Sequence, residues 1–419
     1  MKKITKYLLC IILIICSLSL FACSDSANNP TVPEWADKFD LFSKVLSYVE
    51  ANYIGELDYD KLDYLTAYNL IRALDDFSYL TDDTVSTVST ASLGIAITQT
   101  TYNEYIVDHV YEGFPCSSVQ EDGFVMQRGD FIYAINGERV EGANSSLFNE
   151  LNRGDVGTEL VLTIKRNGEI LGDYSYTKID KPIPKAFYIG DIDAENSQIG
   201  YIKLTEFSDS KTSTGEAVSV NEAFDDCVAK LKADNKTSVI LDLRSNPGGS
   251  ANILSHIASY FIPLDYSNGE PKAVEFMSLK YAKSDEEYTI KVSEDNYLDI
   301  PVVVLVNEKT ASAAEALTGG IRAYNPHHTI IGVKTYGKGV FQARSPKIAD
   351  KTSTSFVFDD TYYIMLVSGY YYIIDPSVEG GRYCIHKNGI IPDIVSSSPT
   401  KGELSKDAEI IEAIKTLTA

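Results

Sequence analysis

Residues 300–324 read IPVVVLVNEKTASAAEALTGGIRAY, and this stretch decides the fold class. Its first part, up to Val306, is a continuous apolar run, which predicts a buried strand. After a short polar loop, residues 311–324 predict a helix. A buried strand that leads through a loop into a helix is the building unit of α/β proteins, whose functional residues commonly lie in such loops.

The same order of elements is found on both sides of this stretch. Residues 237–246, TSVILDLRSN, predict a second buried strand, and PGGSANILSHIASYFI at 247–262 predicts the helix that follows it. HTIIGVKT at 328–335 predicts a third strand. We therefore expect an α/β core over residues 185–400, followed by a helical tail over 401–419.

Two regions of different texture precede this core. Apolar residues at helical spacing predict a small helical region over 36–85. From 90 to 180 the chain alternates short apolar segments with glycine turns, which predicts a small β-rich domain. The whole chain is thus expected to be an α/β, or α+β, multidomain protein.

The first 22 residues have the order of a secretory signal, with the basic start MKKITK and a short apolar run. They end in LFAC, which resembles the lipobox of bacterial lipoproteins and predicts a lipid on Cys23. Residues 23–35 would be a polar tether. We expect a lipoprotein of the cell envelope, anchored to a membrane; a plain cleaved signal or an uncleaved anchor is the alternative.

Charge and cysteine content exclude several functions. The formal net charge is −22, and it becomes more negative once the lysines of the signal are removed, so binding to nucleic acid is not expected. The cysteines beyond the signal region and Cys23 are widely spaced and form no CxxC pair, so neither a disulfide framework nor a metal site is expected. These three residues, Cys116, Cys227 and Cys384, are expected in the core.

The stretch GVKTYGKGV at 332–340 stops one residue short of a phosphate-binding P-loop. A P-loop requires Ser or Thr after its lysine, whereas residue 339 is Gly and VFQARSP then indicates a strand. Nucleotide binding is therefore not expected. A desolvated lysine between two glycines can instead lose its proton and act as a base, which makes Lys338 a candidate.

A base of this kind needs a nucleophile. Ser312 lies at the start of the predicted helix, although its pattern with Glu315 is also that of a capping box, which the local sequence favours. The segment DLRSNPGG at 242–249 ends another strand in a glycine pair, which can leave backbone N–H groups free for an oxyanion. Nucleophile, base and oxyanion site together are the parts of an acyl-transfer enzyme.

At this point the chain resembles the C-terminal processing, or tail-specific, serine peptidases. The resemblance rests on DLRSNPGG, NEKTASAAE, KTYGKGVFQ and NGIIPDI, in that order. It implies a crotonase/ClpP-like peptidase core and an inserted PDZ domain, with no metal or cofactor, and substrates that are proteins or peptides with accessible C-termini. Matched by motif, the implied roles are nucleophile for Ser312, general base for Lys338, positioning of that lysine for Gln342, and oxyanion amides for Ala313 and for Gly248 or Gly249.

Residues 90–180 carry the resemblance to a PDZ domain through SLGI at 92–95, GFPC, RGDFIYAINGERV and the helix-like SSLFNELN. The resemblance implies a peptide-binding loop and pocket that contain Leu93, Gly94, Ile95 and Ile97. A substrate tail would add as a strand beside this segment.

Two alternatives remain open. A histidine could replace the lysine as base, and His256, His327 and His328 lie near the motifs, whereas His109 and His386 carry no motif. The chain could also be a catalytically silent PDZ protein that binds peptides or acts as a scaffold.

Overall fold

The computed structural model describes residues 40–54, 56–82, 91–99, 105–140, 151, 155–192, 194–344, 362–396 and 407–419. The predicted signal 1–22, Cys23, the tether 23–35 and all of the predicted helix SSLFNELN except Leu151 lie outside these residues. Within the described residues, no helix combines the length and the apolar character that a membrane crossing requires.

The core is built on a six-stranded sheet whose order is β10, β11, β14, β17, β18, β22. From β11 onward the neighbours are parallel, and β10 pairs antiparallel with β11. The three strands predicted from the sequence are present as β14, β17 and β18, so the α/β prediction is confirmed here. The bounds are β10 Ala186–Ile189, β11 Ile199–Leu204, β14 Ser238–Asp242, β17 Val302–Val306, β18 His328–Gly332 and β22 Ile394–Val395.

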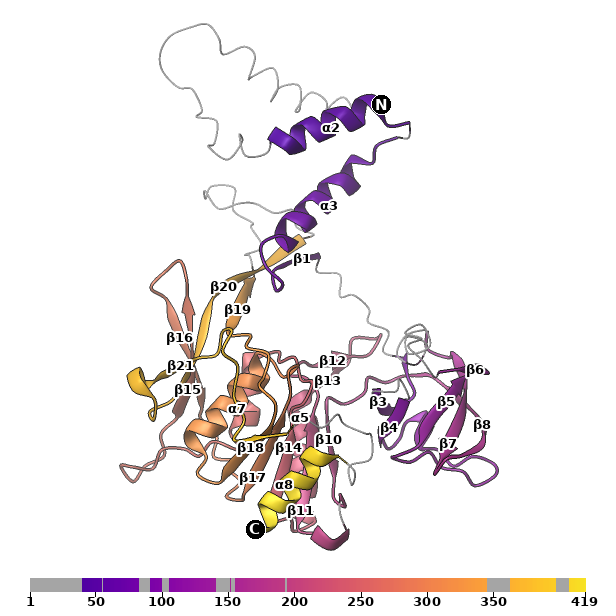
Figure 1. Ribbon diagram of the computed structural model, residues 1–419, viewed down its shortest axis with the longest axis vertical. Coiled ribbons are helices and arrows are strands. Elements are labelled where there is room, and N and C mark those ends of the chain that lie inside the picture. The colour runs from indigo at the N-terminus through magenta and orange to yellow at the C-terminus, as the bar shows by residue number, and fades with distance from the viewer. Residues whose placement is uncertain are drawn as a thin grey trace, which may run out of the picture. The chain divides into compact units, whose positions relative to one another are not determined.

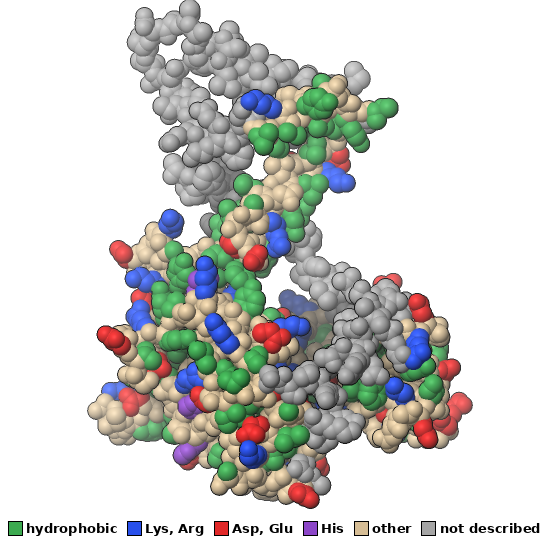
Figure 2. All heavy atoms as spheres, in the orientation of Figure 1, with side chains coloured by type: hydrophobic (Ala, Val, Ile, Leu, Met, Phe, Trp, Pro, Cys, Tyr) green, Lys and Arg blue, Asp and Glu red, His purple; other side chains and the backbone are tan. Residues whose placement is uncertain are grey.

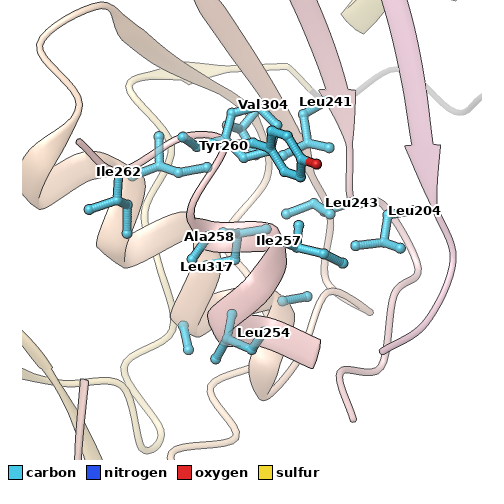
Figure 3. Packing of buried hydrophobic residues seen from close by; sticks show 14 of the residues in the cluster. Leu204, Leu241, Leu243, Leu254, Ile257, Ala258, Tyr260, Ile262, Val304 and Leu317 are labelled. Atoms are coloured by element: carbon cyan, nitrogen blue, oxygen red, sulfur yellow. The ribbon is translucent and has the colours of Figure 1, made fainter. Parts of the chain in front are cut away.

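Helices cover both faces of this sheet, which explains why the central strands β14 and β17 are buried at every residue. Leu241 and Val304 belong to the cluster that includes Leu254 of α6 and Leu317 of α7, as Figure 3 shows. The alternate residues of the strands, such as Ile240, pack with α8, which contacts β14, β17 and β18 (Figure 1). The helices are α5 Val220–Ala233, α6 Ala251–Ala258, α7 Ala313–Tyr324 and α8 Ala408–Thr418, the last inside the predicted helical tail.

Helix α6 is shorter than the sequence predicts. It begins after Ser250, whose side chain accepts a hydrogen bond from Asn252 N, and it ends at Ala258 instead of continuing to residue 262. At the end of the helix, Ser259 Oγ donates to His256 O over 2.6 Å and its amide donates to the same carbonyl. A serine that bonds to the preceding turn competes with the helical pattern, which accounts for the early end.

A second sheet is antiparallel and was not predicted. Its order is β1, β20, β15, β16, and β19 and β21 also pair with β20. The predicted helical region 36–85 is wrong at its end, because residues 79–82 form β1, where Tyr79 pairs with Met365 and Leu80 is buried. The bounds are β1 Tyr79–Asp82, β15 Val274–Tyr281, β16 Glu287–Val292, β19 Val340–Arg344, β20 Tyr362–Ile374 and β21 Arg382–Cys384.

The β-rich domain has a sheet of its own, in the order β3, β4, β5, β7, β8, with β6 paired to β5. Its apolar cluster includes Leu93, Cys116 and Leu162. The strands are β3 Ile95–Gln99, β4 Tyr105–Val110, β5 Phe131–Ile135, β6 Glu138–Arg139, β7 Glu159–Arg166 and β8 Glu169–Thr177. Short elements complete the chain: the pairs β2 Ala91–Ser92 with β9 Ile179–Asp180 and β12 Ser210–Lys211 with β13 Ala217–Val218, and the 3₁₀ helices η2 Pro115–Ser117, η3 Ala194–Asn196 and η4 Glu379–Gly381.

The N-terminal helices are α2 Asp40–Asn52 and α3 Tyr59–Arg72, as the helical spacing predicts. The described residues up to Ala67 belong to one unit of the chain, and those from Tyr68 onward belong to a second. On α2, Leu41 is 75% and Tyr48 is 71% exposed, and Figure 2 shows hydrophobic side chains over the surface of this helix.

The three cysteines predicted to lie in the core are free thiols. Cys116 and Cys227 are buried, as predicted, and burial raises the pKa of the Cys227 thiol to about 12. Cys384 is only half-buried.

Candidate active site

Ser312 lies in the connection between β17 and α7 in an uncommon backbone conformation. Its φ is 56° and its ψ is −120°, whereas the residue that caps a helix ordinarily lies in the β region. A positive φ is costly for a residue with a side chain and persists only where the surroundings enforce it. The capping-box pattern therefore describes only part of what this serine does.

The loop before Ser312 is fixed to the loop after β14. Thr310 Oγ1 donates to Leu243 O over 2.9 Å and accepts from Asn307 N, and Ala311 N donates to Asn246 O over 2.9 Å. These bonds hold the end of β17 against the segment that carries the glycine pair. Two of the three sequence motifs are thus brought together by backbone contacts.

Glu315 joins the serine loop to the lysine loop. Its carboxylate accepts from Ser312 N and Lys338 N, each over 2.9 Å, from Gly337 N over 2.7 Å and from Thr335 Oγ1 over 2.5 Å. Burial raises the pKa of this carboxyl, and the four hydrogen bonds act in the opposite direction. Sequence reasoning assigned Glu315 only to the cap; its partners in the lysine loop lie beyond the reach of a local pattern.

Tyr371 of β20 is a second link between the two loops. Its buried hydroxyl lies within hydrogen-bonding distance of Ser312 O, at 3.0 Å, and of Lys338 O. The backbones of Ser312 and Lys338 therefore share two side-chain partners, Glu315 and Tyr371. The structure brings these two residues to one place, although they come from different strand ends.

The amine of Lys338 is in a partly apolar environment. Its Nζ lies 4.8 Å from the ring centroid of Phe77. Burial lowers the pKa of Lys338, while the negative charges of Asp75 and, to a smaller extent, Glu315 oppose that shift. The net direction is downward, which favours the neutral amine more than in a solvated lysine.

Gln342 of β19 contacts the segment that covers the lysine. Its Nε2 donates to Phe77 O over 3.1 Å. The family resemblance implies that Gln342 helps to position Lys338; its bond to the carbonyl of Phe77 links it to the residue whose ring lies near the amine.

The glycine pair lies directly beside the serine. A Cβ on Gly248, whose φ is 97°, would come within 2.7 Å of both Ser312 Cβ and Ala313 N, so only glycine leaves this space open. A Cβ on Gly249, whose φ is 144°, would meet Phe207 O at 2.3 Å. Both positions therefore require glycine.

The amides of this region differ in their partners. Gly248 N donates to Asn246 Oδ1 over 2.8 Å. In the described part of the chain, the amides of Gly249 and Ala313 have no hydrogen-bond acceptor. These two N–H groups are available for an anion without breaking an existing bond.

A buried ionic cluster supports the strand end that carries the glycine pair. Arg244 donates to Asp242 over 2.7 Å, to Asp407 over 2.7 Å and to Glu409 over 2.6 Å. Burial alone would raise the pKa of Asp242, but the charges of Arg244 and Lys203 outweigh it and lower that pKa. Burial raises the pKa of Glu409 to about 7. The sequence reasoning missed this cluster, because Glu409 belongs to the distant helix α8 and Asp407 caps its N-terminus.

The residues of the predicted peptide-binding loop lie in the β-rich domain. Leu93 and Ile95 are buried in its apolar cluster, and Ile97 is half-buried against it. Leu93 O and Gly94 O accept from Cys116 N and Tyr111 N. Among the described strands, β3 pairs in its sheet only with β4, so one edge of β3 has no strand beside it.

The histidines have other contacts. His256 lies 2.7 Å from Asp225 and 3.1 Å from Glu294, and His328 Nδ1 lies 2.6 Å from Asn325 O. His109 stacks on Phe187, with centroids 4.4 Å apart, and His386 contacts the ring of Tyr370. None of the contacts of these four residues or of His327 in the described part of the chain is with Ser312.

The chain is similar to known peptidases. Residues 198–396 match peptidase family S41. The chain is 26% identical to the carboxy-terminal processing protease CtpA of Bacillus subtilis over 397 residues, which cover 93% of this chain and 76% of the relative. It is 27% identical to a probable CtpA-like serine protease of Staphylococcus aureus, over 89% of this chain and 67% of the relative.

A solved structure supports the fold. A putative S41 protease from Bacteroides fragilis superposes with a TM-score of 0.54 at 18% identity, over 88% of this chain and 92% of that one. An α/β peptidase core with serine and lysine loops in contact defines the class as a serine peptidase. Residues 198–396 of the chain are assigned to the S41 peptidases by this match.

Proposed function

We propose that this chain is an exported C-terminal processing endopeptidase with a Ser/Lys dyad. The observation that carries the proposal is that Glu315 and Tyr371 each contact the backbones of both Ser312 and Lys338. A strained serine beside a partly desolvated lysine and two unoccupied N–H groups is an arrangement suited to acyl transfer. The similarity to the Bacillus subtilis processing protease supports the choice of substrate class.

The mechanism follows from these positions. The neutral amine of Lys338 takes the proton of Ser312 Oγ, and the oxygen attacks the carbonyl carbon of a peptide bond. The oxyanion is held by Ala313 N–H and by an N–H of the glycine pair; Gly249 offers an uncommitted amide, whereas Gly248 N would first have to leave Asn246. Collapse expels the amine, which receives the proton from Lys338, and water then hydrolyses the acyl-enzyme.

The test is proteolysis by the full mature chain. Ser312→Ala and Lys338→Ala should each abolish cleavage of a peptide substrate, and the double variant should be no worse than either. Lys338→Arg should also be inactive, because a guanidinium does not become neutral. Cleavage by Lys338→Ala would contradict the dyad, and a wild-type chain that binds but never cleaves would favour the silent scaffold.

The β-rich domain is proposed to be a PDZ domain that binds the substrate C-terminus. The edge of β3 that has no strand beside it supports this role, because a peptide tail can add there as a further strand. One peptide should be compared as free acid and as amide. Faster cleavage of the free acid is expected, and equal rates would remove the recognition role while leaving the dyad untouched.

Membrane anchoring through a lipid on Cys23 is proposed from the motif LFAC alone. Cys23→Ala should release the protein from the membrane fraction or block its processing. A wild-type protein that carries no lipid and fractionates with soluble proteins would contradict the anchor.

A further inference from the structure

The turn of residues 75–78, between α3 and β1, is fixed by the side chain of its first residue. Asp75 Oδ1 accepts from Phe77 N over 2.7 Å and from Ser78 N over 2.6 Å, and Oδ2 accepts from Ser78 Oγ over 2.8 Å. A carboxylate that accepts from the amides two and three residues later holds a turn in one conformation. We call this segment the 75–78 turn.

The 75–78 turn is attached to the two strands that follow the lysine loop. Val367 N of β20 donates to Ser78 Oγ over 3.0 Å, and Gln342 Nε2 of β19 donates to Phe77 O over 3.1 Å. The strand that continues the turn, β1, pairs with β20. The position of the turn is therefore set by the peptidase core.

The aromatic side chain of the turn lies near the lysine amine. The ring of Phe77 has its centroid 4.8 Å from Lys338 Nζ, and it also contacts the ring of Tyr336 edge to face at 6.3 Å. The carboxylate of Asp75 interacts electrostatically with Lys338. An aromatic face within about 6 Å of an amine attracts its charged form and excludes water from it.

We propose that the 75–78 turn is part of the catalytic machinery, with Phe77 covering the Lys338 amine and Asp75 supplying the negative charge that balances this cover. The inference rests on the proposed function of Lys338 as general base. Both residues are positioning residues, because they act through the lysine and not on the substrate. They lie outside every motif that carried the family resemblance.

The charges and the burial around Lys338 predict the direction in which each substitution shifts the pKa of this lysine. The charged groups that face it are Asp75 from the turn and Glu315 from α7, while the hydroxyl of Tyr371 touches its carbonyl. Burial lowers the pKa of the lysine, and the two carboxylates raise it, Asp75 more than Glu315. Removing the Asp75 charge should therefore lower the pKa further, and removing the cover should raise it.

The first experiment is the pH profile of kcat/KM for Asp75→Asn. Asparagine keeps an oxygen for the turn amides but loses the charge, so the lysine becomes neutral at lower pH. The acidic limb should move to lower pH, and the rate on that limb should rise roughly two- to tenfold relative to wild type. Asp76→Asn is the matched control, because this substitution removes the same charge from an exposed side chain one residue away.

The second variant, Phe77→Ala, should move the limb in the opposite direction. Loss of the ring opens the amine to water, which raises the pKa of Lys338, and it also removes the attraction of the ring for the ammonium ion, which lowers that pKa; the proposed role as a cover requires the first effect to be the larger. Thermal unfolding of each variant shows that the chain is folded when its profile is measured. If the turn were purely structural, the two variants would not shift the acidic limb in opposite directions while their unfolding temperatures stay unchanged.

The outcomes separate this inference from the function on which it depends. If Asp75→Asn leaves the limb in place, or moves it no further than Asp76→Asn, the inference is wrong although Ser312→Ala and Lys338→Ala are inactive. If Lys338→Ala cleaves peptide, the proposed function itself is wrong.

Discussion

Glu315 and Glu409 are both buried carboxyl groups, 0% and 4% exposed, but they are satisfied in different ways. Glu409 accepts from the guanidinium of Arg244 over 2.6 Å. Glu315 accepts from three backbone amides and the hydroxyl of Thr335. One carboxylate is paired with a permanent cation, and the other is held by neutral donors.

The difference separates a structural charge cluster from the proposed site of proton transfer. A carboxylate in direct contact with a lysine would keep the lysine protonated, because a nearby negative charge favours the charged form of the amine. In the described part of the chain, no carboxylate forms an ion pair with Lys338 Nζ. Glu315 thus orders the serine and lysine loops without fixing the charge of the proposed base.

Removal of Arg244 should break the structural cluster and have the largest effect on stability. Arg244→Ala leaves Asp242, Asp407 and Glu409 buried without their cation, which should cost about 3–5 kcal/mol of unfolding free energy. Urea denaturation measures the loss. The control is Arg382→Ala, which removes a partly exposed ion pair with Glu287 and should cost no more than about 1 kcal/mol. Equal losses would contradict the distinction.

Replacement of Glu315 should break the proposed catalytic site while Glu409 is spared. In the wild type, N–H donors of both loops bond to the carboxylate oxygens of Glu315. In Glu315→Gln, one of these oxygens becomes an NH₂ group, which cannot accept from the donors, so the two loops should separate. We expect kcat/KM to fall roughly 100-fold, the equivalent of one or two charge-assisted hydrogen bonds. Glu409→Gln measured in the same peptide assay should lose far less. A similar loss in both variants would mean that any buried glutamate of the core affects activity.

The pH dependence of stability should sharpen the comparison. Because the folded-state pKa of Glu409 is raised to about 7 from an ordinary 4.5, the folded protein binds more protons than the unfolded chain between these values. The stability contributed by this group is present below about pH 4.5 and is lost as the pH rises through about 7, by at most about 3 kcal/mol. Glu409→Gln should flatten this fall in denaturation midpoints from pH 5 to 8, whereas Glu412→Gln on the same helix should not.

The smallest expected effect concerns a neutral donor. Thr335 Oγ1 donates to Glu315 over 2.5 Å and accepts from Ile390 N over 2.6 Å. Thr335→Val should cost about 1–2 kcal/mol of stability, since it leaves a buried amide without its acceptor. Because three amides still hold Glu315, peptide cleavage should persist with a modest decrease. Loss of cleavage as complete as in Glu315→Gln would show that the amides alone do not fix the carboxylate.

Local sequence patterns were sufficient to predict the α/β core and the proposed catalytic motifs that follow its strands. The strands that precede Gly248 and Ser312 have continuous apolar centres, whereas the strand before Lys338 begins with His328 and Thr329; parallel strands bring their carboxyl ends to one edge of a sheet. The α/β core and the proximity of these motifs could therefore be predicted. Whether Gly248 or Gly249 offers a free amide could not, because the side chain of Asn246 decides it.

Contacts between segments far apart in the chain escaped prediction. The pairing of β1 with β20 turned the end of a predicted helical region into a strand. Arg244 meets Asp407 and Glu409 across most of the core sequence, and Asp75 and Phe77 meet Lys338 across the whole β-rich domain. No periodicity or short motif encodes such pairs, since each depends on the finished packing of the sheets.

Strand β20 has a consequence for the order of events during synthesis. It supplies Tyr371 to the serine and lysine loops and pairs with β1, which directly follows the 75–78 turn. A ribosome makes β1 early and β20 late, and domains fold as they emerge. A nascent chain that has exposed Ser312 and Lys338 but not yet β20 therefore lacks both the tyrosine and the anchor for the lysine cover. Assembly of the proposed site thus depends on a strand that follows both Ser312 and Lys338 in the chain.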